Sequence, residues 1–374
     1  MKRSLTMLAL AGVMMAGSPL LRADMVVKIG FAGPLTGPIS HVGKDEQFGA
    51  QMALDDANGH GVSLAGQKVR FELMPEDDQA DPRTATTVAQ RLVDAGVKGV
   101  VGHVTSGAAI PASRIYEQAG VPAITPSSTS PKLTRQGYRT TYRVIANDLQ
   151  QGAAMAKFAT EALKASRIAV IDDRTAYGQG LADALVDSLK QRGVTPVGRE
   201  FTNDKATDFA AILTKLKAAR PDAIFYGGMD AQGAPLLKQM KQLGIAARFL
   251  GGDGVCTAEM VKIAGKAMSS DVYCTQAGIP MDRMPAGKAF NERFTKRFNA
   301  PVQLYAPYSY DAATALIEAM KLADSPDPAK YVPQLRKVAF KGVTGNVAFD
   351  ANGDIRDGGV ALYQFNAGKW EPRP

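Results

Sequence analysis

Two kinds of pattern alternate along most of this 374-residue chain. Short runs rich in valine and isoleucine predict buried strands, and stretches with apolar residues at a helical period predict helices between them. Strands separated by helices form parallel sheets that are covered by helices on both faces. The chain is also too long for one ordinary hydrophobic core, so we expect two α/β units of similar size.

The predicted strands share a mostly apolar, β-branched composition and cover residues 26–31, 69–74, 99–104, 121–125, 167–172, 223–226, 249–251, 347–350 and 360–365. The predicted helices share an apolar face and cover residues 47–58, 82–96, 177–192, 209–216, 235–243, 286–298, 310–322 and 328–338. The second of these helices has clear ends, because Asp81-Pro82 supplies an N-cap and a first-turn proline and Gly96 suits a C-cap. A break near residues 145–150 separates the two units.

The start of the chain has the composition of a secretion signal. A basic segment, residues 1–3, is followed by a mostly apolar run over residues 5–16 and by the small residue Ala23. The apolar run is too short to span a membrane, which needs roughly 20 residues. We therefore predict a signal peptide over residues 1–23, cleaved after Ala23, and a mature protein in the periplasm.

The charge of the chain gives no support for a nucleic-acid partner. The formal net charge of +8 falls by three, to +5, when Lys2, Arg3 and Arg22 leave with the signal peptide. The remaining basic residues are scattered, without a block that could follow a phosphate backbone. We expect a soluble monomer whose partners are a small molecule and membrane subunits.

The cysteines and histidines predict a disulfide bond and no metal site. Cys256 and Cys274 are the only cysteines, and an even pair in an oxidising compartment favours a disulfide over two buried free thiols. The three histidines, His41, His60 and His103, are too scattered to form a zinc-type cluster. We therefore expect neither a metal ion nor another cofactor.

Motifs for catalysis are absent from the sequence. There is no G-x-S-x-G nucleophile elbow, no Walker-type phosphate loop and no G-x-G-x-x-G after a strand. Polar loop residues do follow the predicted strands, and open α/β sheets bind ligands at that edge. The sequence therefore predicts a binding protein and not an enzyme.

Five blocks in register between about residues 26 and 370 resemble the periplasmic branched-chain amino acid binding proteins. The blocks are VKIGFAGPLTG at 27–37, GHVTS at 102–106, ITPSST at 124–129, DRTAYGQG at 173–180 and YGG at 226–228. The resemblance implies the type I periplasmic binding protein fold, in which two Rossmann-like lobes with mainly parallel sheets are joined by three crossing segments. It implies an N-terminal lobe of residues 24–147 and 277–347 and a C-terminal lobe of residues 148–276 and 348–374.

The same resemblance implies the residues that hold the ligand. Ser106 and Thr129 match positions at the ligand carboxylate, and Ser127 matches a position whose carbonyl accepts from the ligand ammonium. Asp253 matches an acidic residue, often glutamate in the family, that pairs with the ammonium, and Tyr177 matches an aromatic residue that closes over the ligand. Two alternatives stay open, namely that Asp253 caps a helix and that Tyr177 is a core residue.

The predicted side-chain pocket departs from that of the leucine, isoleucine and valine binders. Val104 and Thr105 are expected at its floor, and Met229 and Tyr305 at its walls. Val42 and Met229 stand where the family often has tyrosine. Because two aromatic side chains are lost and apolar character is kept, we expect a wider pocket.

The resemblance implies the solute-binding component of an ABC importer. Such a protein captures an amino acid, here branched-chain or otherwise apolar, by lobe closure and delivers it to permease subunits in the inner membrane. The alternative is the same fold binding a neutral amide, urea or an aromatic acid for uptake or sensing. The family's usual disulfide is missing, and Cys256 and Cys274 instead bracket one helix beside Asp253.

Overall fold

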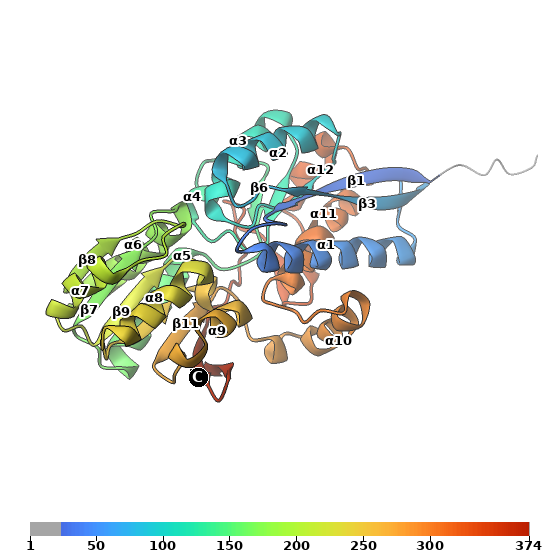
Figure 1. Cartoon of the computed structure of the whole chain (residues 1–374). Coiled ribbons are helices and arrows are strands. Elements are labelled where there is room, and N and C mark those ends of the chain that lie inside the picture. Colours follow the sequence, from blue (N-terminus) through green and yellow to red (C-terminus); the bar gives the residue numbers. More distant parts are fainter. Residues whose placement is uncertain (1–23, 374) are drawn as a thin grey trace, which may run out of the picture.

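The computed structural model describes residues 24–373, so the predicted signal peptide lies outside the described residues. The described chain forms two lobes, each built on a mainly parallel sheet (Figure 1). The first sheet has the order β2-β3-β1-β4-β5-β6, and the second has the order β15-β14-β11-β10-β9-β7-β8. This is the predicted fold class. In the first sheet, β3 and β2 follow on one side of β1, and β4, β5 and β6 follow on the other side.

The strands of the first sheet are β1 (Met25–Gly33), β2 (Ser63–Leu64), β3 (Gln67–Asp77), β4 (Val100–Gly102), β5 (Ala123–Thr125) and β6 (Thr141–Arg143). The helices around it are α1 (Ser40–His60), α2 (Pro82–Asp94), α3 (Ser106–Ala119), α4 (Pro131–Thr134), α10 (Gly287–Phe298), α11 (Ala306–Ala323) and α12 (Pro328–Leu335). A two-stranded sheet follows them, formed by β12 (Ala339–Lys341) and β13 (Asn346–Ala348).

The strands of the second sheet are β7 (Ile168–Asp172), β8 (Gly198–Phe201), β9 (Ala223–Gly227), β10 (Arg248–Gly251), β11 (Val272–Gln276), β14 (Ala361–Asn366) and β15 (Lys369–Arg373). The helices of this lobe are α5 (Asp148–Lys157), α6 (Ala176–Gln191), α7 (Ala210–Ala218), α8 (Asp230–Gln242) and α9 (Ala258–Ala264). β14 and β15 are the antiparallel strands of this sheet.

Alternation of side chains along β1 explains why helices cover both faces of the first sheet. Val27, Ile29 and Phe31 lie in the core that α1 and α11 share, and Ala32 lies in the core on the opposite face. Successive residues of a strand point to opposite faces, so both faces of β1 are apolar. In Figure 1 helix α11, near the end of the chain, lies beside the blue helix α1, and α12 packs against α11. Residues far apart in sequence therefore build one lobe.

The chain passes between the two sheets three times. It leaves the first lobe after β6, returns to the helices of the first lobe after β11, and crosses to the second lobe again between β13 and β14. Arg143, at the end of β6, ties two of these segments together, because its guanidinium donates to the Asp354 carboxylate at 2.5 Å. Among residues 24–373, no helix has the length and hydropathy needed to cross a membrane.

Two helices that reach the cleft begin earlier than the sequence predicted. α1 begins at Ser40 rather than at residue 47, because its first turns contain the charged residues Asp45 and Glu46, which are buried and hide the apolar pattern. α8 begins at Asp230 rather than at residue 235, because Pro235 lies inside the helix and not in its first turn.

Two longer helices, α3 and α5, were missing from the prediction, as was the four-residue helix α4. α3 contains Pro111, which argues against a helix interior. α5 is preceded by Asn147, whose side chain and that of Gln150 form a capping box, a start signal that the sequence did contain.

The predicted disulfide between Cys256 and Cys274 is present. The two Cα atoms lie 5.6 Å apart, and the bond joins the end of the 3₁₀ turn at Asp253–Val255 to β11. The bond therefore fixes the segment that carries Asp253 to the sheet of the second lobe.

We predict that removing this disulfide with Cys256→Ala and Cys274→Ala lowers the free energy of unfolding by about 3 kcal/mol, because the bond closes a short loop in the unfolded chain. The two cysteines are 18 residues apart in sequence. Urea unfolding of the double variant and of the wild-type protein under reducing conditions would measure the change. A loss below about 1 kcal/mol in both experiments would contradict the prediction.

Candidate ligand-binding cleft

A cavity of about 710 Å³ lies between the two lobes. Eight of the nine residues predicted to bind the ligand line it, and they are Val104, Thr105, Ser106, Ser127, Tyr177, Met229, Asp253 and Tyr305. The ninth, Thr129, is fully buried and is not among the lining residues. A cavity of this volume is ordinary for a site that encloses a small molecule.

Most of these residues lie at the cleft because they follow the carboxyl ends of parallel strands. Ser106 follows β4, and Ser127 follows β5 in the first lobe. Tyr177, Met229 and Asp253 follow β7, β9 and β10 in the second lobe. Since the carboxyl ends of parallel strands meet at one edge of a sheet, two such edges face each other across the cleft.

The first lobe presents hydrogen-bond donors around Ser106. The Ser106 hydroxyl oxygen accepts from the Ser128 hydroxyl at 3.2 Å and from the Ser130 backbone N–H at 3.1 Å, which leaves its own proton free to be donated. Ser106 is also the first residue of α3, and the side chain of Thr105 makes no hydrogen bond that caps this helix. Uncapped first-turn N–H groups of a helix attract an anion.

Ser127 and Thr129 each lie beside a buried carboxyl group. The Ser127 hydroxyl donates to the carbonyl of Val104 at 2.9 Å, and Glu46 lies next to Ser127. Burial raises the pKa of Glu46 well above its ordinary value, which favours its neutral form. Burial likewise raises the pKa of Asp148, which lies beside Thr129, to about 8.

Asp253 is the centre of the polar network on the second lobe. Its carboxylate accepts from the Tyr177 hydroxyl at 2.6 Å and from the Tyr305 hydroxyl at 2.7 Å, and the Gln151 amide donates at 3.1 Å. Burial raises the pKa of Asp253, and these three donors oppose that shift. The backbone N–H of Asp253 also lowers this pKa, and the residue lines the cavity, where its carboxylate can face a positive charge on a ligand.

Two contacts join the lobes across the cleft. Tyr305 precedes α11 in the first lobe, and its hydroxyl reaches Asp253 in the second. His41 of α1 lies 2.9 Å from the carboxylate of Asp230, the first residue of α8, through its Nε2 atom. Thr257 donates to the same Asp230 oxygen at 2.5 Å. The lobes are therefore in a closed arrangement.

The comparisons with known proteins agree with this architecture. A family model described as periplasmic binding protein matches residues 26–369. The chain belongs to the periplasmic binding protein family.

Among curated relatives of this periplasmic binding protein is the leucine-, isoleucine-, valine-, threonine- and alanine-binding protein of Pseudomonas aeruginosa, 35% identical over 340 residues, which are 91% of this chain and 90% of the relative. The crystal structure of a leucine binding protein from Thermotoga maritima has a TM-score of 0.86 and 30% identity, covering 93% of this chain and 98% of that one. A branched-chain amino acid transporter substrate-binding protein from Streptococcus pneumoniae, in complex with isoleucine, has a TM-score of 0.84 and 30% identity, with 92% and 98% coverage. The two lobes thus have the type I arrangement.

Two glutamines are among the residues at this binding protein's cleft that the sequence analysis did not predict. Gln151 links Asp253 to the Thr275 hydroxyl, and Gln232 lines the cavity from the first turn of α8. Gln151 could have been found from the capping box that starts α5. Gln232 had no comparable signal, because α8 was predicted to begin after it. The predicted pocket residue Val42 does line the cavity, together with its neighbour Ile39.

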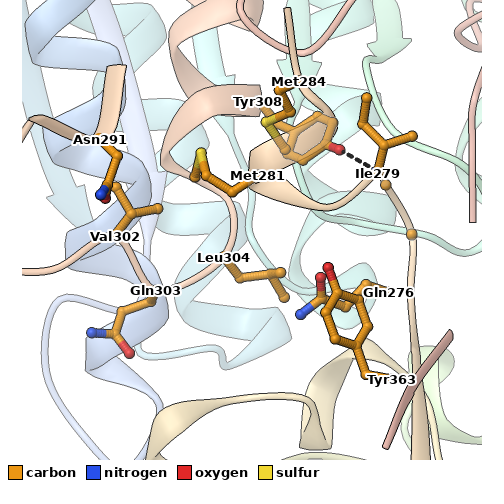
Figure 2. Close-up of a pocket in the computed structure, with 12 residues that line it drawn as sticks. Gln276, Ile279, Met281, Met284, Asn291, Val302, Gln303, Leu304, Tyr308 and Tyr363 are labelled. Carbon is orange, nitrogen blue, oxygen red and sulfur yellow. Dashed lines mark hydrogen bonds between the residues drawn. The ribbon is translucent and has the colours of Figure 1, made fainter. Parts of the chain in front are cut away.

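A second, smaller cavity of about 290 Å³ lies where β11 leaves the second lobe (Figure 2). Apolar residues such as Met281, Met284 and Leu304 line it, and the Tyr308 hydroxyl there accepts from the backbone N–H of Ile279 at 2.9 Å. None of the ligand-binding residues predicted from the sequence lines this cavity.

Proposed function

We propose that this periplasmic binding protein captures a free neutral α-amino acid in the closed cleft and delivers it to the permease of an ABC importer. The observation that carries the proposal is the pairing of opposite chemistry across the cavity. Donors around Ser106 line it on the first lobe, and the Asp253 carboxylate lines it on the second. The curated relatives and solved neighbours that bind leucine, isoleucine or valine support this assignment.

The ligand carboxylate would bind at the start of α3. The Ser106 hydroxyl has a free proton, and the first-turn N–H groups of the helix add partial positive charge. Thr129, which the resemblance assigns to the carboxylate, supports the same loop from a buried position next to Asp148.

The ligand ammonium would bind between the Ser127 carbonyl and Asp253. Burying both charges of a zwitterion is costly unless each finds a partner. Asp253 offers a buried carboxylate at the cavity wall, held in place by its bonds to Tyr177, Tyr305 and Gln151. Several donors on one lobe and one carboxylate on the other meet that requirement.

Lobe closure links capture to transport. The residues for the two charged ends stand on different lobes, so full ligand contact needs the closed form, and only that form would present both lobes together to a permease. We propose that the protein acts as a monomer in the periplasm after loss of the predicted signal peptide, and that the ATPase activity resides on another subunit.

Calorimetry on protein freed of co-purified ligand tests this function. Titration with leucine, isoleucine, valine and phenylalanine is expected to give at least one Kd of about 1 μM or tighter, near −8 kcal/mol. Mass spectrometry of the small molecule that co-purifies would identify the natural ligand directly. Undetectable binding of every free amino acid would reject the proposed ligand class.

The contact between His41 and Asp230 predicts pH-dependent affinity. Burial lowers the pKa of His41, but the hydrogen bond and charge of Asp230, with the charges of Glu259 and Asp45, outweigh this and raise it. In an open form without Asp230 the pKa would return to about 6.5. Protonated His41 therefore stabilises closure fully below that pH, and this contribution is lost as pH rises through the higher pKa of the closed form.

We expect the Kd for the amino acid to rise several-fold between about pH 6 and pH 8. His41→Gln should remove the part of this rise that His41 causes, while groups such as Asp148 still titrate in both proteins. The exposed His60→Gln variant is the matched control and should keep the wild-type profile. Identical pH profiles for His41→Gln and wild type would contradict this prediction.

A further inference from the structure

The first turn of α8 opens into the cleft without a cap. Met229 is the N-cap residue and supplies no side-chain acceptor, although serine, threonine, aspartate or asparagine is preferred there. Within residues 24–373 no acceptor is found for the backbone N–H groups of Asp230 and Ala231. Met229 and Ala231 both line the cavity, so these donors lie at its wall.

A second, independent observation concerns Gln232 in the same turn. Its side chain is 9% exposed and lines the cavity, and across the described part of the chain no hydrogen-bond partner is found for its amide. The amide atoms of Gln232 are not among the fully buried unpaired polar atoms of the described residues, so they are accessible from the cavity. The amide can both donate and accept, so it can pair with an acceptor, a donor or both on a ligand in the cavity.

The charges around this turn argue for a neutral partner. A cation on the ligand would face the positive end of the α8 dipole. An anion would face the carboxylate of Asp230, one residue from the cavity wall, which is fully buried. The cavity is also lined by Ile39 and Val42, which suit an aliphatic stem, and by the oppositely charged residues Asp204 and Lys205.

We propose that Gln232 and the uncapped start of α8 form a subsite for a neutral carbonyl group on the side chain of the ligand. A carboxamide fits this subsite, because its oxygen accepts from the free N–H groups or from Gln232 and its NH₂ donates to the Gln232 oxygen. The protein therefore binds neutral carboxamide amino acids more tightly than their apolar isosteres. This inference rests on the proposed function and narrows its substrate class.

Calorimetry with L-asparagine and L-leucine tests the subsite, because the two side chains branch alike and differ mainly in polarity. The wild-type protein is expected to bind asparagine about tenfold more tightly than leucine, since leucine displaces water from the Gln232 amide and the first-turn N–H groups without offering them a partner. Gln232→Leu should raise the ratio of the asparagine Kd to the leucine Kd by about tenfold or more. Gln242→Leu, an exposed change at the other end of α8, should leave the ratio unchanged.

Leucine binding by Gln232→Leu also shows that the variant is folded. Tighter binding of leucine than asparagine by the wild type, or a ratio that Gln232→Leu changes by less than about fivefold, would overturn the inference. In either case leucine binding would leave the proposed function intact. If the wild type bound neither these two ligands nor any other free amino acid, the proposed function itself would fail.

Discussion

Asp253→Asn is expected to weaken amino acid binding by about 2–5 kcal/mol, which is roughly thirtyfold to several thousandfold in Kd. The asparagine amide keeps the shape of the side chain, and its oxygen can still accept from the Tyr177 hydroxyl while its NH₂ can donate to the Tyr305 hydroxyl oxygen. It removes the negative charge that would face the ligand ammonium inside a closed cleft. The loss is large because a buried ammonium without its counter-charge keeps its full desolvation penalty.

The control for this experiment is Asp271→Asn, a substitution of the same type at an exposed position of the same lobe. It should leave the Kd unchanged, and the thermal unfolding of unliganded Asp253→Asn should show that this variant folds. If Asp253→Asn bound its ligand within about twofold of the wild type, the Asp253 carboxylate would not be acting as a counter-charge to a ligand ammonium. The alternative of a neutral amide or urea ligand in the same fold would then gain support.

Arg143→Met is expected to lower the free energy of unfolding by about 3–5 kcal/mol. The Arg143 side chain is fully buried, and it donates to the Asp354 carboxylate and to the backbone carbonyls of Ser128 and Ser130. Without it, one carboxylate and two carbonyls in the hinge region lose their partner. Urea unfolding monitored by circular dichroism would measure the change.

Arg139→Met provides the comparison, because Arg139 is four residues away, is 80% exposed and lies 3.7 Å from Glu117. An exposed pair of this kind contributes at most about 1 kcal/mol. The double variant Arg143→Met with Asp354→Leu should recover part of the stability, since it removes both charges together. Equal losses for Arg139→Met and Arg143→Met would contradict the account of the hinge.

Local sequence signals were enough to predict most of the architecture. The apolar runs that became β7 and β9 are buried at every position, and β1 is buried from Ile29 onward, which makes such strands the strongest signal in a parallel sheet. Asp253, which follows β10, was predicted at the ligand from the family resemblance, and its position after a strand end agrees with where open α/β sheets bind ligands. The disulfide followed from the expected compartment and from an even number of cysteines.

The pairings across the cleft could not be predicted in the same way. Tyr305 was expected to be an aromatic wall, and its hydroxyl also bonds to Asp253, 52 residues earlier and on the other lobe. His41 and Asp230 are 189 residues apart, and nothing near either residue in the sequence indicates the other. Glu46 has a charged side chain in a helix and would be expected at the surface, yet it is buried beside Ser127. Such contacts depend on how closed lobes meet, which local patterns do not encode.

The most direct test of the account compares one amino acid with two derivatives that each lack a single charge. Ligand-free protein would be titrated by calorimetry with the tightest-binding amino acid, its methyl ester and its N-acetyl form. If Ser106 and Asp253 hold opposite ends of a zwitterion, each derivative should bind at least about a hundredfold more weakly than the parent. A derivative that binds as tightly as the free amino acid would show that the cleft does not recognise the charge which that derivative lacks. This result would contradict the account.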